Sequence, residues 1–185
     1  DQIKKGQQVW VLDGAAYVKG AVVEVTEEIS TVATEDGRTV TCVQEAVFPS
    51  NPSLLDGVDD LTRLSHLHEA GILCVLRDRF GGSEGVSRKE IYTHAGPVLI
   101  AVNPFQSVPD LYAPGQVDHF VRRPAMGVGA NDVEKYRPHI FLTADKAFKE
   151  MRLRGKSQSI IITGESGAGK TETTKFVMQY VAGLV

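Results

Sequence analysis

Residues 164–173, GESGAGKTET, place three glycines, a lysine and a threonine at a spacing that can hold phosphate. The spacing matches G-x-x-x-x-G-K-[ST], a loop whose backbone N–H groups turn inward around an anion. Glycine suits such a loop because the chain passes close to the anion in conformations that a Cβ would obstruct. The residues predicted to line this site are Gly164, Glu165, Ser166, Gly167, Ala168, Gly169, Lys170, Thr171 and Glu172.

Lys170 and Thr171 are the residues of this loop that we predict to take part in catalysis. Lys170 would place a positive charge on the β and γ phosphates of a nucleotide. The Thr171 hydroxyl would coordinate the Mg²⁺ ion that bridges those phosphates, which makes Thr171 the predicted metal ligand. The helix that begins here adds free N–H groups and the positive end of its dipole.

The residues on either side of the loop favour the same interpretation. Residues 158–163, QSIIIT, form a short β-branched run that predicts a strand buried on both faces. After the loop, apolar residues recur on one face of a predicted helix, namely Phe176, Val177, Tyr180, Val181 and Leu184. The alternative is a glycine-rich turn that matches the pattern by chance, without a ligand.

The composition is that of an ordinary globular protein. The chain has 185 residues, 42% hydrophobic and 23% charged, with a net charge of −3, so we expect one or two domains. No basic field draws it to nucleic acid, and no apolar run approaches the length of a membrane span. Cys42 and Cys74 are too few for a disulfide framework, which predicts reduced thiols in a cytosolic protein. Because the chain begins with Asp1 rather than Met, we expect a piece of a longer protein.

The first 50 residues predict a small antiparallel barrel. Residues 6–48 alternate between apolar and polar positions and are interrupted by turn residues. The predicted strands cover residues 7–13, 17–26, 30–36 and 38–43. Such a barrel could bind a peptide or nucleic acid, but the stretch has one tryptophan and no aromatic stacking platform. Structural packing is the preferred interpretation.

Turn formers in residues 48–57 mark the predicted domain boundary. The stretch 59–80 predicts two short helices broken near Gly71. Two histidines in it, His66 and His68, would point in different directions on a helix, so we interpret both as packing or surface residues and not as metal ligands.

Residues 91–102 predict two strands around a turn at residues 95–97. A helix is predicted from Pro138 to Gly155, with a basic run at its end that would complement the helix dipole. Its apolar face consists of Phe141, Ala144, Phe148 and Met151. A lone G-x-G at Gly127 and Gly129 is weak evidence for a dinucleotide site. The order β, α, β, α predicts a sheet whose strand 158–163 presents nucleotide at its carboxyl end.

Four segments together resemble the start of a myosin motor head. They are DDLTRLSHLHEAGILCVLRDRF, IYTHAGPVLIAVNPF, PHIFLTADKAFKEM and GKSQSIIITGESGAGKTE, in the order that the family has. The resemblance covers residues 57–185, and the barrel of residues 1–50 takes the place of the Src-homology-3-like subdomain of many myosins. It implies an α/β P-loop NTPase portion, with an incomplete mixed sheet and flanking helices, preceded by a small all-β Src-homology-3-like barrel.

In that family an Asn-Pro-aromatic stretch and a later tyrosine form much of the adenine side of the ATP pocket. The resemblance therefore implies a base site formed by Asn103, Pro104, Phe105 and Tyr112. The spacing in NPFQSVPDLY resembles the plant and algal class-eleven form. Two differences are Ser107, where relatives often carry a basic residue, and longer connections at residues 80–90 and 121–137, which we interpret as surface loops.

The resemblance implies an ATPase that uses ATP and Mg²⁺, an actin filament as partner, and light chains or calmodulin on a lever that these residues do not include. It also implies a cytoplasmic location on the actin cytoskeleton. The two switch motifs of the family are not found in the sequence, so we expect no hydrolysis by these residues alone. The alternatives are another P-loop protein, such as a kinase or GTPase, and a non-catalytic scaffold whose barrel binds a partner. A guanine-reading Asn-Lys-x-Asp motif is not found.

Overall fold

The computed structural model describes residues 3–81, 90–121 and 137–184. The chain divides into two compact units, Asp1–Val86 and Ser87–Val185. Among the described residues no helix is both long enough and apolar enough to span a membrane. The predicted Gly127 and Gly129 pair and most of the two long loops lie outside the described residues.

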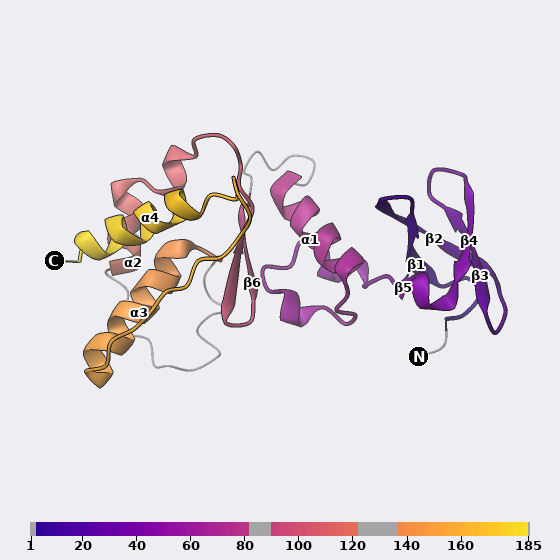
Figure 1. Cartoon of the computed structure of the whole chain (residues 1–185), viewed down its shortest axis with the longest axis horizontal. Helices are drawn as coiled ribbons and strands as arrows, with labels where there is room; N and C mark the ends of the chain where they lie inside the picture. Colours follow the sequence, from indigo (N-terminus) through magenta and orange to yellow (C-terminus); the bar gives the residue numbers. More distant parts are fainter. Residues whose placement is uncertain (1–2, 82–89, 122–136, 185) are drawn as a thin grey trace. The chain divides into compact units, whose positions relative to one another are not determined.

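The first unit begins with a five-stranded antiparallel sheet in the order β4-β3-β2-β1-β5. Its strands are β1 (Gln8–Asp13), β2 (Ala16–Val25), β3 (Ile29–Thr34), β4 (Thr39–Val43) and β5 (Val47–Pro49). Figure 1 shows the sheet curling on itself, and alternate residues enclose a core of Val9, Val11, Val22, Val32 and Val47. The predicted strands are confirmed, whereas β5 was missed because it has only three residues.

Glycine is required at one place inside this sheet. Gly20 on β2 lies against β3, and a Cβ placed there would overlap the carbonyl oxygen of Ala33 and crowd Val32. Real Cβ atoms do not approach so closely, so the absence of a side chain lets the two strands pair here.

The prediction of two helices broken near Gly71 is wrong. The structure has a short 3-10 turn, η3 (Leu61–Arg63), followed by one helix, α1 (Glu69–Gly81). Gly71 lies in the first turn of α1, and its N–H donates to Nδ1 of His68 at 3.1 Å. This side-chain cap stabilises the helix start, and tertiary packing offsets the weak helix propensity of glycine.

The segment between the barrel and α1 is held by hydrogen bonds. Asn51 donates to the carbonyl of His66 at 3.0 Å and accepts from its N–H at 2.8 Å. The His68 ring lies 5.2 Å from Phe48 and 2.8 Å from the carbonyl oxygen of Pro49 through Nε2. The His68 ring therefore lies in a packing contact, whereas the contacts given for His66 are those of its backbone groups. No group of three metal-ligating side chains occurs in the described part of the chain. The predicted division into residues 1–50 and 57–185 stays a prediction.

The second unit contains a two-stranded antiparallel hairpin and three α-helices among its described residues. The elements are β6 (Tyr92–Ala95), β7 (Val98–Ala101), the 3-10 turn η4 (Pro109–Leu111), α2 (Pro114–Val121), α3 (Ile140–Arg154) and α4 (Lys170–Ala182). The hairpin confirms the two strands predicted around residues 95–97, and α4 confirms the helix predicted after the glycine-rich loop.

The strand predicted over residues 158–163 is not formed, and that prediction is wrong. These residues have no regular secondary structure and Ile161 is 84% exposed. A strand needs a neighbouring strand for its N–H and C=O groups, and no described segment pairs with this one. The predicted parallel pairing is accordingly absent from the described residues.

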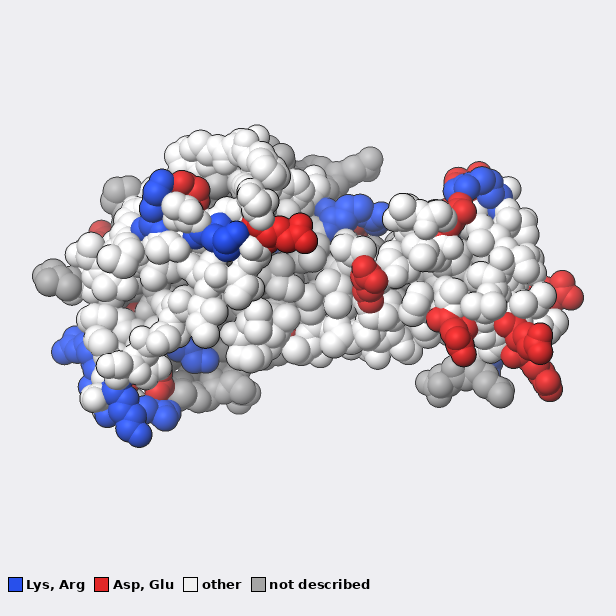
Figure 2. Space-filling model, in the orientation of Figure 1, with Lys and Arg blue, Asp and Glu red and all other residues white. Residues whose placement is uncertain are grey.

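Helix α3 confirms the prediction of a helix between Pro138 and Gly155. Its N-cap is His139, whose Nδ1 accepts the N–H of Phe141 at 3.0 Å, and its C-cap is Gly155 with φ 62°. Figure 2 shows the basic side chains gathered at the far end of α3. Two members of the basic run pair within the helix, Lys149 with Asp145 and Arg154 with Glu150.

Helices α3 and α4 pack against each other through an apolar face that surrounds one polar contact. Phe141 and Tyr180 are fully buried, and their rings lie 5.2 Å apart. The Tyr180 hydroxyl donates to Oδ1 of buried Asp145 at 2.9 Å, while Lys149 donates to Oδ2 at 2.7 Å. This contact fixes the helix that follows the glycine-rich loop.

Candidate phosphate-binding site

The glycine-rich loop has the backbone conformations that its sequence requires. Gly164, Gly167 and Gly169 have φ values of 153°, 80° and 95°, which side chains rarely allow. The Ala168 N–H donates to the carbonyl of Glu165 at 3.2 Å and closes a turn. Gly169 is the N-cap of α4, so the loop leads directly into a helix N-terminus. The first N–H groups of a helix have no partner within it and are available to an anion.

The Lys170 side chain folds back over this loop. Its ammonium group donates to the carbonyl oxygens of Gly164 at 2.8 Å and Glu165 at 2.7 Å. A lysine ammonium has three N–H donors, so these two contacts still allow one to an anion. The contacts place the positive charge of Lys170 beside Gly164 and Glu165 at the start of the loop, and the sequence predicts that this charge contacts the β and γ phosphates.

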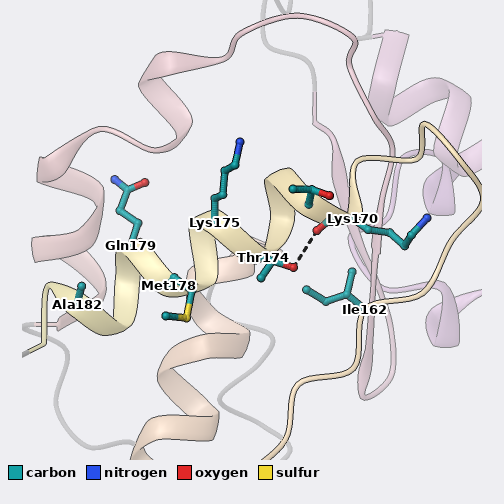
Figure 3. Close-up of a pocket in the computed structure, with 8 residues that line it drawn as sticks. Ile162, Lys170, Thr174, Lys175, Met178, Gln179 and Ala182 are labelled. Atoms are coloured by element: carbon teal, nitrogen blue, oxygen red, sulfur yellow. Dashed lines mark hydrogen bonds between the residues drawn. The ribbon is translucent and has the colours of Figure 1, made fainter.

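Thr171 and Lys170 lie at one end of an open hollow of about 840 Å³. Figure 3 shows the hollow along the exposed side of α4, from Ile162 beside the loop to Ala182. It is lined by Ile162, Lys170, Thr171, Thr174, Lys175, Met178, Gln179 and Ala182. The predicted base-side residues do not line it.

The acidic residue at the start of α4 is paired on the surface. Glu172 accepts from Lys175 at 2.6 Å, and both side chains are more than half exposed. A negative charge in the first turn favours the helix dipole. Glu172 therefore contributes to the start of the helix, and its contact with phosphate would come from its backbone.

Asn103 joins the turn at residues 103–105 to the glycine-rich loop. Its Nδ2 donates to the carbonyl oxygen of Gly167 at 2.7 Å, and its Oδ1 accepts the N–H of Phe105 at 2.9 Å. These contacts bring residues 103 and 167 together across 64 positions of sequence. Pro104 is half-buried, whereas Phe105 is 84% exposed with φ 49°.

Tyr112 lies against α4 in an aromatic cluster. Its ring stacks on Phe176 with centroids 3.5 Å apart and planes 7° apart. Its hydroxyl lies 2.7 Å from that of Tyr92, and its carbonyl accepts from Gln179 at 3.3 Å. Burial raises the pKa of Tyr112, and burial together with the neighbouring Tyr112 raises that of Tyr92 far above its ordinary value. Both hydroxyls therefore stay protonated and can act as hydrogen-bond donors.

Phe176, like Tyr92, belongs to this cluster but was not assigned to the site from the sequence. The sequence places it on the packing face of α4, and that periodicity does not reveal that its partner is Tyr112. The stack covers one face of the Tyr112 ring, so that face is not available to a base.

Comparison with known proteins decides the family. Residues 58–185 match the family described as "Myosin head (motor domain)", and residues 1–51 match "Myosin N-terminal SH3-like domain". The chain belongs to the myosin family. The myosin resemblance and the fold class of a Src-homology-3-like barrel followed by part of a motor domain are thereby confirmed.

Relatives within the myosin family match almost the whole chain. Myosin-17 of Arabidopsis thaliana is 42% identical over 181 residues, which are 97% of this chain and 11% of that protein. Myosin-J heavy chain of Dictyostelium discoideum is 42% identical over 185 residues, 98% of this chain and 8% of that protein. The chain thus spans about a tenth of the length of these myosins. Plant myosins among the relatives agree with the predicted likeness to the class-eleven form.

The loop of this myosin-family chain fits a magnesium-bound phosphate group. The positive-φ glycines leave the loop free of side chains at the turns, and Thr171 presents an exposed hydroxyl beside Lys170. This chain would offer Mg²⁺ the Thr171 hydroxyl, beside the phosphate oxygens of the ligand. Magnesium is commonly held in this way, by few protein ligands and the substrate phosphates.

Proposed function

We propose that the full-length protein is an actin-based motor that couples MgATP hydrolysis to movement along actin filaments. In this proposal the chain supplies the phosphate loop and part of the adenine pocket. The observation that carries it is the loop of residues 164–169, with three positive-φ glycines, which ends as the N-cap of α4 in a chain of the myosin family. Family membership favours a motor over the kinase, GTPase and scaffold alternatives.

The residues of this chain would act by binding and positioning. Lys170 and the N-terminus of α4 would hold the β and γ phosphates, and the Thr171 hydroxyl would hold Mg²⁺, which neutralises charge that develops during phosphoryl transfer. Nothing in the described residues is placed to orient an attacking water. Since positioning is most of what such enzymes contribute, we propose that the 185 residues alone do not hydrolyse ATP.

The base side of the site is proposed from the contacts of the 103–112 segment. Asn103 lies on the phosphate loop, and Tyr112 stacks on the helix that follows the loop. Pro104 and Phe105 lie between them in sequence and offer apolar surface to a purine. We propose that this side binds adenine and favours ATP over GTP.

The proposed partners follow from the motor function. They are an actin filament and, on a lever, light chains or calmodulin, with the protein in the cytoplasm on the actin cytoskeleton. Neither partner would contact the phosphate loop itself, so a variant in the loop should affect nucleotide turnover without removing the partner surfaces.

The test is Lys170→Ala in the full-length protein. The loss of the charge on the β and γ phosphates should reduce actin-activated ATPase and filament gliding to background. Lys156→Ala is the matched control, because Lys156 is an exposed lysine outside the loop. The 185-residue chain is assayed beside them and should release no phosphate. A Lys170→Ala protein that moves filaments at the wild-type rate would refute the assignment of the loop.

A further inference from the structure

Both ends of the Asn103 amide are engaged by backbone groups. Nδ2 donates to the carbonyl of Gly167 in the phosphate loop at 2.7 Å, and Oδ1 accepts from the N–H of Phe105 at 2.9 Å. An amide reads a base through the same two atoms, as one donor and one acceptor. In the structure one N–H of Nδ2 and one lone pair of Oδ1 already have partners, and these two bonds orient the Asn103 amide toward the loop and its own turn.

The conformation around Asn103 is shaped by these contacts. Phe105 is the one non-glycine residue with positive φ among the described residues, and its side chain is 84% exposed. Such a conformation is unfavourable for a residue with a side chain and persists only where its surroundings maintain it. Here the side-chain Oδ1 of Asn103 accepts the Phe105 N–H and maintains the turn.

Asn103 also lies close to the last glycine of the loop. A Cβ on Gly169 would lie 3.7 Å from Cγ of Asn103 and 3.8 Å from Nδ2. The side chain thus bonds to the carbonyl of Gly167 and lies beside Gly169, where an added Cβ would be in van der Waals contact with it. Both are glycines with positive φ, which are the positions where the backbone has the most freedom to move.

We propose that Asn103 is a positioning residue for the phosphate loop and does not discriminate between bases through its amide. Its hydrogen bond fixes the Gly167 carbonyl, and we infer that this fixes the adjoining peptide groups whose N–H donors would face the phosphates. The inference rests on the proposed nucleotide-binding function and deepens it by assigning one base-side residue to the phosphate end of the ligand.

The two roles predict opposite results with ligands that share phosphates but differ in the base. A positioning residue affects the affinity for Mg-tripolyphosphate, Mg-ATP and Mg-GTP by the same factor. A base-reading residue affects the ratio of ATP to GTP affinity and leaves tripolyphosphate unchanged. A net hydrogen bond corresponds to a factor of about two to ten in affinity.

The experiment measures dissociation constants of these three magnesium complexes for the full-length protein. The variants are Asn103→Ala and Asn103→Ser. A serine can still accept the Phe105 N–H in a local turn but is too short to reach Gly167, so it isolates the contact with the loop. Asn51→Ala is the matched control, because the Asn51 amide also makes two hydrogen bonds with backbone groups, both with His66. Asn51 and His66 belong to the first unit, whereas Asn103 belongs to the second. Circular dichroism and thermal melting of each variant report whether the protein is folded.

We expect both Asn103 variants to weaken all three ligands by the same factor of about two to ten, and Asn51→Ala to leave them at wild-type affinity. The inference alone is overturned if Asn103→Ala binds tripolyphosphate like wild type and loses its preference for ATP over GTP. It is also overturned if Asn51→Ala weakens the ligands equally. Wild-type protein that binds neither ATP nor tripolyphosphate would overturn the proposed function together with the inference.

Discussion

Replacement of Tyr180 by phenylalanine tests how the helix after the phosphate loop is held. Tyr180 is fully buried, and its hydroxyl donates to Oδ1 of Asp145, which is 5% exposed. The substitution removes only the hydroxyl and keeps the ring that lies 5.2 Å from Phe141. Asp145 then keeps Lys149 on its other oxygen, and Oδ1 loses the tyrosine donor.

The size of the expected loss of stability follows from the charge and burial of the acceptor, the Asp145 carboxylate. A hydrogen bond to a charged group contributes about 1.5–3 kcal/mol, and an unsatisfied buried acceptor costs a similar amount. We therefore expect Tyr180→Phe to lower the free energy of opening of α4 by about 2 kcal/mol. This corresponds to opening that is about 30 times more frequent.

Hydrogen exchange of residues 170–182 in the full-length protein measures this opening directly. The matched control is Tyr17→Phe, since the Tyr17 hydroxyl also donates to a carboxylate, that of Glu69 at 3.0 Å, but on the surface. Exposed pairs contribute about 0–1 kcal/mol, so exchange near Tyr17 should change little. Unchanged protection of α4 in Tyr180→Phe, or an equal effect of Tyr17→Phe in its own region, would refute the reasoning.

Two further predictions concern the first unit. Gly20→Ala should destabilise the barrel by about 1–3 kcal/mol, because the new Cβ clashes with Ala33. Gly115→Ala is the control and should not destabilise the protein, because a Cβ there meets open space. Equal midpoints of urea unfolding for the two variants would contradict the prediction. Burial, with the nearby Asp78 charge, raises the pKa of the Cys74 thiol to about 11. The rate of Cys74 alkylation should therefore rise about tenfold per pH unit up to that value. The protonated Cys74 thiol contributes to the stability of the folded state below the ordinary pKa of 9, and this contribution should disappear as the pH rises toward 11. A rate that levels off near pH 9 would show an unperturbed thiol.

Much of the local structure follows from the sequence because its causes lie within a few residues. The strands of the barrel follow from alternating apolar residues, and the helix α3 follows from an apolar face that ends at Gly155 in the left-handed conformation. The glycines at 164, 167 and 169 predict a loop that bends where side chains would obstruct it, and the structure has positive φ at all three. The myosin resemblance adds the order of the segments.

The errors occur where an element depends on partners distant in sequence. Residues 158–163 have the composition of a buried strand, but a strand forms only where another supplies hydrogen bonds, and none among the described segments does so. A helix break was predicted near Gly71, but α1 begins at Glu69 and includes Gly71 in its first turn. This turn is stabilised by His68, whose ring accepts the Gly71 N–H and packs on Phe48. The sequence pattern of a segment indicates which secondary structure it favours. Whether that structure forms in these two segments depends on the strands and side chains that lie beside them in the fold.

The sequence by itself determined the glycine-rich loop of this protein, since spacing, glycine content and the following helix are all local properties of residues 164–182. Only the tertiary structure decided what surrounds that loop. It placed the Asn103 amide on Gly167 and stacked Tyr112 on Phe176, contacts that cross more than 60 positions of the chain. The physical reason is that hydrogen bonds and ring contacts act over a few ångströms in space, so residues far apart in the chain become one site only through folding.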